Sequence, residues 1–265
     1  MRSPLLAILS IMILFEQSYA SSSQQEVNMG TTIVALKTQT GVVLGADTRT
    51  SASTMVSNRY ANKISFLYRD GPISCVLCRS GSAADTQYLA DEARWAFRSR
   101  AQQIGKGSIS VSQIARWLRY VVMNGNYGAS LLCAGYDPLD GSRIYSIAPT
   151  GALLEESVFA ASGSGSTYIL GLMDTALKDH QKENNLLEEE EAIELVTKLV
   201  HAAVARDGSS GGVARIVVMN DQGSRELIRH PPPSFDSALT GEGGKELKGF
   251  QAATPPPKLQ SFKSS

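Results

Sequence analysis

The chain has 265 residues, of which 43% are apolar, enough to bury a sizeable core in one large domain or two small ones. Its 25 basic and 25 acidic residues give a formal net charge of zero. This balance offers no electrostatic footprint for nucleic acid or for an anionic membrane surface, so neither is predicted as a partner.

The N-terminus resembles a secretory signal peptide. An apolar run from Leu5 to Phe15 follows a basic residue and ends shortly before a small-x-small site at residues 18–20. The run is too short to span a bilayer. A signal peptide over residues 1–20 is therefore one interpretation, and the alternative depends on the residues that follow.

Gly30 and Thr31 stand at the start of an apolar, β-branched run that predicts a strand. Taken alone, Gly-Thr-Thr only marks where a strand begins. Cleavage between Gly30 and Thr31, however, would give Thr31 both a hydroxyl and a free α-amine. A threonine hydroxyl needs an adjacent base to become a nucleophile, and an α-amine with a pKa of roughly 7.7–8.0 can serve as that base. We therefore interpret residues 1–30 as a removable leader that masks a nucleophile.

The spacing of apolar residues predicts blocks of strands that alternate with pairs of helices. Strands are expected at residues 31–36, 41–46, 64–68, 73–78, 129–135, 142–147, 152–160, 213–219 and 224–228. A polar loop is expected at residues 47–63, and helices are expected to begin near Ser82, Ser110, Ser166 and Leu187. Segregated blocks of this kind favour an α+β fold, with antiparallel sheets and helices layered outside them, over a βαβ winding.

Two of the predicted helices carry more detailed signals. Gln113, three residues after Ser110, completes the pattern of a capping box. The helix that begins at Ser82 has a predicted apolar stripe, formed by Ala84, Tyr88, Leu89, Ala93 and Ala96.

The three cysteines, Cys75, Cys78 and Cys133, are too few for a disulfide framework. The Cys75-x-x-Cys78 pair could be a redox motif or half of a zinc site. However, no second pair exists, and two strand positions three apart point to opposite faces. We therefore expect core thiols. The three histidines are scattered, so no metal and no cofactor are predicted.

The composition changes at residue 231. Two Pro-Pro-Pro runs and a Gly-rich stretch bracket polar residues, which is typical of a disordered tail or one draped over a partner. The predicted organisation is a leader at 1–30, a domain at 31–230 and a tail at 231–265.

Four separated segments carry small or charged residues where a fold alone would favour apolar ones. They are residues 45–49, 62–63, 79–85 and 206–212. Ser-Gly-rich turns near Ser164 and Ser210 could be simple connectors or a phosphate cradle, but neither follows a full nucleotide-binding pattern.

Together with Gly30-Thr31-Thr32, these segments resemble the catalytic β subunits of the proteasome core particle, threonine proteases with the N-terminal nucleophile (Ntn) hydrolase fold. The resemblance covers residues 26–229, and the run from Arg79 to Gln87 most resembles the caspase-like subunit, which cuts after acidic residues. It implies a four-layer αββα sandwich of two antiparallel sheets flanked by helices. It also implies unfolded polypeptide substrates, stacked heptameric rings shared with other α and β proteasome subunits, and a cytoplasmic and nuclear location.

The resemblance assigns roles to individual residues of this chain. Thr31 would be the nucleophile once Gly30 is removed. Lys63, paired with Asp47, would favour the alkoxide-like form of the hydroxyl, and the Gly81 N–H would hold the developing oxyanion. The groups that orient the amine and its water would be Ser164, Asp207 and Ser210.

The same resemblance places a substrate strand between Thr50-Ser51 and the segment from Gly81 to Ala83. Arg79 would set the first specificity pocket, because a guanidinium attracts and pairs carboxylates. The hairpin at 64–78 is longer than the family pattern, so Arg79 is aligned through an insertion. The apolar leader and the tail also depart from that pattern.

Two other functions stay open at this stage. One is a structural ring subunit that never matures, in which residue 31 stays attached to Gly30. The other is a secreted binding module that begins at Ser21 after its signal peptide is removed. The first residue of the working chain separates all three.

Overall fold

The computed structural model describes residues 30–52, 55–182 and 185–231. The leader predicted at 1–30 and the tail predicted at 231–265 lie outside these residues except at their boundary positions, so both stay predictions. Within the described part, none of the helices combines the length and the apolar character that a bilayer crossing requires.

In the described part of the chain, two five-stranded antiparallel sheets form the centre of the fold. The first sheet has the strand order β10 (Phe159–Ser162), β1 (Ile33–Lys37), β2 (Gly41–Asp47), β11 (Ala214–Asn220) and β12 (Gly223–Arg229). The second sheet has the order β5 (Ile64–Asp70), β6 (Ile73–Gly81), β7 (Ala129–Asp137), β8 (Gly141–Ile147) and β9 (Leu153–Glu155).

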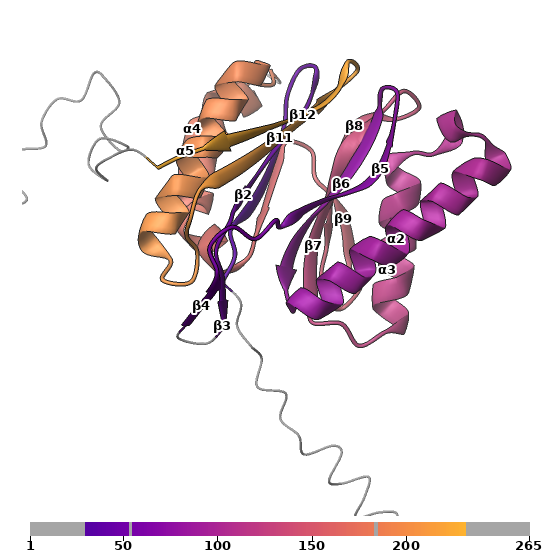
Figure 1. Ribbon diagram of the computed structural model, residues 1–265. Coiled ribbons are helices and arrows are strands. Elements are labelled where there is room, and N and C mark those ends of the chain that lie inside the picture. The colour runs from indigo at the N-terminus through magenta and orange to yellow at the C-terminus, as the bar shows by residue number, and fades with distance from the viewer. Residues whose placement is uncertain (1–29, 53–54, 183–184, 232–265) are drawn as a thin grey trace, which may run out of the picture. The chain divides into compact units, whose positions relative to one another are not determined.

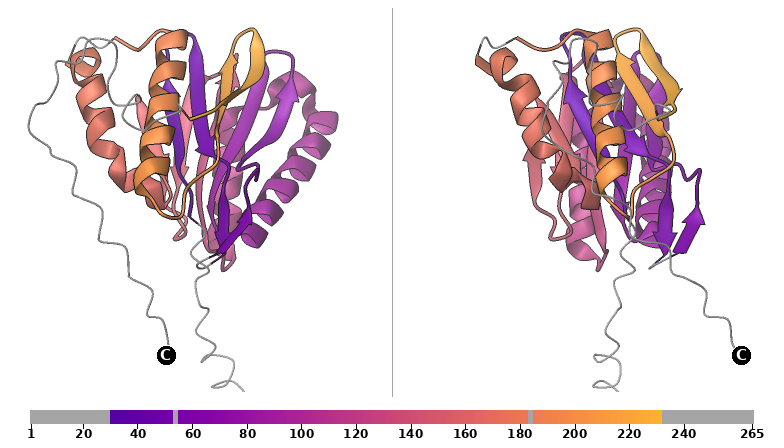
Figure 2. Two further views of the ribbon diagram at one scale, coloured as in Figure 1. Left: turned by 60° about the vertical axis from the view of Figure 1, so that its left-hand side comes forward. Right: turned by 90° about the vertical axis from the view of Figure 1, so that its left-hand side faces the viewer.

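Helices cover the outer face of each sheet. Helices α2 (Ala83–Ile104) and α3 (Val111–Asn124) pack on the second sheet, and α4 (Leu170–Lys182) and α5 (Glu189–Arg206) pack on the first. Two short 3₁₀ turns, η1 (Lys106–Ser108) and η2 (Ser164–Tyr168), precede α3 and α4. The views in Figure 1 and Figure 2 show this order of helices, sheet, sheet and helices. The predicted four-layer α+β sandwich is therefore confirmed.

The core is divided into three apolar layers, one between the sheets and one beneath each helix pair. Strand β2 shows why the first sheet is buried on both sides. Val42 and Leu44 face the other sheet, whereas Val43 faces the helices. Gly45 lies under α5, where a Cβ would come within 2.4 Å of a Val196 methyl carbon, so the missing side chain lets the helix approach.

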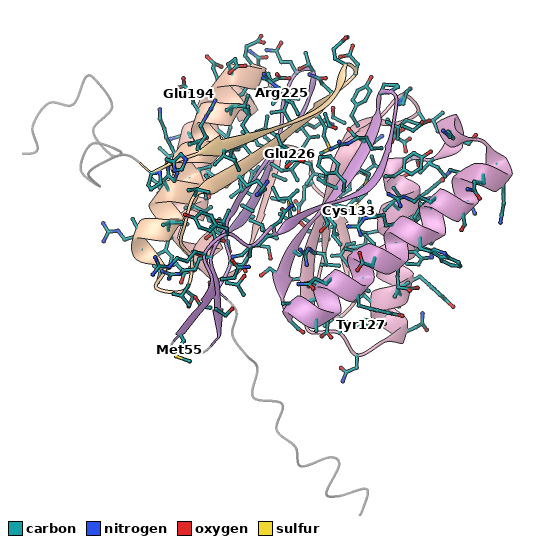
Figure 3. The ribbon with its side chains drawn as sticks, viewed as in Figure 1. Met55, Tyr127, Cys133, Glu194, Arg225 and Glu226 are labelled. Atoms are coloured by element: carbon teal, nitrogen blue, oxygen red, sulfur yellow. The ribbon has the colours of Figure 1, made fainter. Side chains whose placement is uncertain are left out.

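The polar segment expected as a loop at 47–63 also contains a two-stranded ribbon, β3 (Thr50–Ala52) and β4 (Met55–Asn58). The ribbon projects from the end of the sheets, and Met55 lies at its tip (Figure 3). Met55 is 74% exposed. All four residues of β4 are exposed. In β3, Ser51 is buried by a hydrogen bond to the Ser209 carbonyl and not by apolar packing, so the apolar periodicity that signals a core strand is missing.

The single strand predicted at 152–160 is wrong. The segment forms two strands, of which β9 pairs with β8 in the second sheet and β10 pairs with β1 in the first. The chain passes from one sheet to the other over residues 156–158. The third helix was likewise expected from Ser166, but the segment begins with η2 and becomes α-helical only at Leu170.

The predicted start of α2 is confirmed, because Ser82 Oγ accepts a hydrogen bond from the Asp85 N–H at 3.3 Å. Its predicted apolar stripe is partly wrong, since Tyr88 is 50% exposed. Thr86 is buried instead, and its hydroxyl donates to the Ser82 carbonyl at 2.8 Å. A buried threonine is tolerated there because its polar atom is paired within the helix.

The capping box predicted for α3 is only half formed. Ser110 Oγ accepts a hydrogen bond from the Gln113 N–H at 3.3 Å. Gln113 Oε1, however, is buried and has no hydrogen-bond partner among the described residues.

The cysteines behave as predicted from their strand positions. All three are free and buried. Cys75 and Cys133 lie in the layer beneath α2 and α3, whereas Cys78 lies between the sheets. Burial raises the pKa of the Cys78 thiol, which suits a structural core thiol better than a reactive one.

Candidate active site

The ammonium of Lys63 lies beside the predicted cleavage bond. Lys63 immediately precedes β5, and its side chain is buried. Its Nζ donates to the Gly30 carbonyl oxygen at 3.0 Å and to Asp47 Oδ1 at 2.6 Å. Thr31, the next residue after that carbonyl, is itself buried. The structure thus brings together Gly30, Thr31, Asp47 and Lys63, four residues that the sequence had singled out.

Burial lowers the pKa of Lys63, and the attraction and hydrogen bond of the Asp47 carboxylate oppose that effect without cancelling it. The ammonium is therefore easier to deprotonate than that of a solvated lysine.

The Asp47 carboxylate is surrounded by hydrogen-bond donors. Besides the Lys63 ammonium, Oδ1 accepts from the Thr32 N–H at 2.9 Å. The other oxygen, Oδ2, accepts from the N–H groups of Arg49 at 3.2 Å and Gly211 at 2.9 Å. Asp47 is fully buried at the end of β2. One carboxylate therefore fixes the start of β1, the segment after β2 and the loop before β11.

A second carboxylate, Asp207, lies just past the end of α5 and holds two serines. Asp207 Oδ2 accepts from Ser164 Oγ and from Ser210 Oγ, both at 2.6 Å. Ser164 Oγ in turn accepts from the Thr31 nitrogen at 3.2 Å. Burial alone would raise the pKa of Asp207, but the hydrogen bonds from Ser164 and Ser210 outweigh it and lower that pKa. The carboxylate is therefore ionised and acts only as an acceptor near neutral pH.

A pocket opens next to Thr31. Its lining includes most of the predicted substrate-binding residues, and the full set is Thr31, Thr50, Ala61, Asn62, Lys63, Arg79, Gly81, Ala83, Thr86 and Gln87. Ser51 is not among them. Its side chain is buried and its hydroxyl donates to the Ser209 carbonyl at 3.1 Å. A main-chain contact of Ser51 with a substrate strand stays a prediction.

Arg79 lies in this pocket with spare hydrogen-bonding capacity. One of its terminal nitrogens donates to the Asn62 carbonyl. Its Nε is buried and has no hydrogen-bond partner in the part of the chain that the structure describes. Burial, together with the nearby charge of Arg94, lowers the pKa of Arg79.

Gly81 is a glycine for two reasons. Its φ of +102° is disfavoured for residues with a side chain, and a Cβ there would lie 2.2 Å from the Gly128 carbonyl oxygen. The role of its N–H as an oxyanion donor stays a prediction.

Two residues of the network were not assigned a role from the sequence. Thr32 Oγ1 lies 2.8 Å from Ser210 Oγ, and the Arg49 guanidinium donates to the carbonyls of Gly208 and Ser209. No sequence signal marks Thr32, because it belongs to a β-branched run that is typical of any strand. The run of small residues at 208–212 is the sequence signal for Arg49, because a Cβ at Gly211 would come within 2.9 Å of the guanidinium carbon.

Metal ligands are not gathered anywhere in the described ranges, where no three His, Cys, Asp or Glu side chains lie close enough together to hold an ion.

The chain matches the family model "Proteasome subunit" over residues 27–219. It is 40% identical over 198 residues to proteasome subunit beta type-6 of Arabidopsis thaliana, which covers 74% of this chain and 80% of that protein. It is 35% identical over 207 residues to proteasome subunit beta type-1 of Saccharomyces cerevisiae, with 78% and 91% covered. It is 35% identical over 214 residues to proteasome subunit beta type-9 of Homo sapiens, with 79% and 92% covered.

These relatives carry three different β-type numbers, so they show the family and do not single out one β type. The chain belongs to the proteasome subunit family, and the relatives that it matches are β-type subunits.

Proposed function

We propose that this chain is a threonine-type endopeptidase subunit of the proteasome core particle that cleaves unfolded polypeptides, preferentially after acidic residues. It works in stacked heptameric rings with other α and β subunits, in the cytoplasm and nucleus. The observation that carries the proposal is the position of the Lys63 ammonium, 3.0 Å from the Gly30 carbonyl oxygen and 2.6 Å from Asp47. A buried, acid-paired lysine next to a Gly-Thr bond suits the activation of the Thr31 hydroxyl.

Maturation would be the first reaction of the site. The Thr31 hydroxyl attacks the Gly30 carbonyl carbon, an oxygen–carbon bond forms, and the carbon–nitrogen bond breaks. The released nitrogen becomes the new α-amine by taking up the proton that the Thr31 hydroxyl lost, and water hydrolyses the resulting ester. The hydrogen bond from Lys63 to the Gly30 carbonyl oxygen favours this attack, because it stabilises the negative charge that develops there.

Peptide cleavage would then repeat the same acyl transfer on a substrate. Thr31 Oγ attacks the scissile carbonyl while its own amine, through water, takes the proton and later passes it to the leaving amine. The Gly81 N–H holds the oxyanion, and a second water releases the acyl-enzyme. The Ser164 hydroxyl, which accepts from the Thr31 nitrogen, would hold the amine in place.

The preference for acidic residues rests on Arg79. Its buried Nε without a partner and its place in the lining of the pocket next to Thr31 suit a carboxylate, which would supply the missing acceptor.

Mass spectrometry of the first residue of the purified chain tests the proposal. The wild-type chain should begin at Thr31. Thr31→Ala should keep Gly30 attached and should not cleave the bond that follows a glutamate in a peptide substrate. Thr31→Ser keeps a hydroxyl and should still mature. A wild-type chain that retains Gly30 would instead support the structural ring subunit, and one that begins at Ser21 would support the secreted module.

A further inference from the structure

The side chain of Thr32 is fully buried in a polar position rather than in the apolar core. Its hydroxyl oxygen lies 2.8 Å from Ser210 Oγ. A Cβ on Gly165 would come within 2.0 Å of that hydroxyl, so the glycine leaves just enough room for it. Thr32 also donates its backbone N–H to Asp47 Oδ1. The backbone N–H and the hydroxyl of Thr32 therefore reach both carboxylates of the site, the N–H directly and the hydroxyl through Ser210.

The direction of each hydrogen bond in this network can be worked out from the number of protons. Asp207 is ionised and can only accept hydrogen bonds, so Ser164 and Ser210 each donate their single hydroxyl proton to it. Ser210 Oγ must then accept from the Thr32 hydroxyl.

The two sides of the network therefore have matching directions. On one side Thr32 donates to Ser210, and Ser210 donates to Asp207. On the other side the Thr31 nitrogen donates to Ser164, and Ser164 donates to Asp207. Two consecutive residues of the chain thus hold the two serines that share one carboxylate oxygen.

We propose that Thr32 is a positioning residue, whose hydroxyl fixes the orientation of Ser210 and thereby of the Asp207 carboxylate that holds Ser164 against the Thr31 nitrogen. This inference rests on the proposed function. Without the Thr32 hydroxyl, the buried Ser210 oxygen loses its donor and can rotate, so Asp207 and Ser164 are held less firmly.

The test is Thr32→Val, which keeps the shape of the side chain and removes only the hydroxyl. The assay uses purified particles that contain the chain. The kcat for cleavage after glutamate in a peptide substrate should fall about tenfold, which corresponds to about 1.4 kcal/mol in activation free energy. KM should stay within about twofold, because Thr32 does not line the pocket. Thr32→Ser should restore kcat.

The pH profile gives a readout that a purely structural role would not move. After maturation, Ser164 Oγ, which accepts from the Thr31 nitrogen, and the Asp207 carboxylate behind it would favour the protonated amine of Thr31. When they are held less firmly, the pKa of that amine should fall. The limb of the kcat/KM profile that reports the amine should shift to lower pH in Thr32→Val and return to the wild-type position in Thr32→Ser.

Double mutants identify the route of the effect. In a Ser210→Ala background, Thr32→Val should cost little more, since the partner of its hydroxyl is already gone. Additive losses would overturn the proposal, and so would a Thr32→Val enzyme with the wild-type kcat and pH profile. If valine prevents folding, Thr32→Ala and Thr32→Ser give the same comparison.

Thr31→Ala, measured alongside, separates this inference from the proposed function. If Thr31→Ala retains activity, the proposed function fails. If Thr31→Ala is inactive but Thr32→Val equals the wild type, only the role of Thr32 is lost.

Discussion

Replacement of Asp47 with asparagine should strongly destabilise the fold, although the two side chains have the same shape. Four groups of the described residues hydrogen-bond the Asp47 carboxylate, and all four are donors: three backbone N–H groups and the Lys63 ammonium. Asparagine offers one acceptor oxygen, and its NH₂ group must face the other donors. Whichever way the amide lies, two donors lose their acceptor inside the protein.

The size of the effect follows from that count. A hydrogen bond to a charged group contributes about 1.5–3 kcal/mol, so two lost bonds cost roughly 3–6 kcal/mol. The Lys63 ammonium would also stay buried without its counter-charge, a situation that is costly by itself. We therefore expect the free energy of unfolding to fall by at least about 3 kcal/mol, which is a large part of the stability of a typical domain.

Urea denaturation followed by tryptophan fluorescence measures this change, with two matched variants. Asp91→Asn alters a surface carboxylate that is 70% exposed and paired with Arg94, so it should cost less than about 1 kcal/mol. Lys63→Met should fall between the two, because the Asp47 carboxylate keeps three backbone donors. If Asp47→Asn unfolds at the same urea concentration as Asp91→Asn, the four-donor description of the site is refuted.

Three further predictions concern the leader, the specificity and the pH dependence. Gly30→Ala should slow leader removal at least about tenfold, because the added Cβ would lie 1.8 Å from the Ser209 Cβ. Mass spectrometry follows the removal, and a normal rate would contradict this close fit. Arg79→Leu should lower kcat/KM for cleavage after glutamate by about 10- to 100-fold and should not lower it for cleavage after leucine. Equal losses in both reactions would argue against a carboxylate pocket. The lowered pKa of Asp207 adds stability that is present above its unfolded pKa of about 3.9 and is lost as the pH falls through the lower folded value. The difference in urea midpoint between wild type and Asp207→Asn should therefore shrink from pH 6 to pH 3, and a constant difference would exclude this linkage.

Much of the fold could be predicted because the relevant signals are local. The start of α2 at Ser82, and the short break between the strands predicted at 213–219 and 224–228, follow from short-range rules of capping and turn chemistry. The segment at 152–160 shows the limit. Its residues suit a strand throughout, but the change of sheet depends on which neighbours pair with each half, and no local pattern encodes that choice.

The candidate site shows the same division. Asp47 and Lys63 lie in two of the four segments with small or charged residues where a fold alone would favour apolar ones, but their pairing was implied only by the family resemblance. The structure pairs them at 2.6 Å. The contribution of Thr32 could not be predicted in this way. A threonine suits any strand, and its partner Ser210 lies 178 residues away in the sequence. Only the folded geometry brings the two hydroxyls together.

Because the three thiols lie in different layers of the core, their accessibility reports which layers separate when the protein partly unfolds. Cys75 and Cys133 can meet a labelling reagent only if α2 and α3 lift from their sheet, whereas Cys78 requires the two sheets to part. Labelling rates at the separate sulfurs would therefore distinguish loss of a helical layer from separation of the sandwich, with no engineered probe.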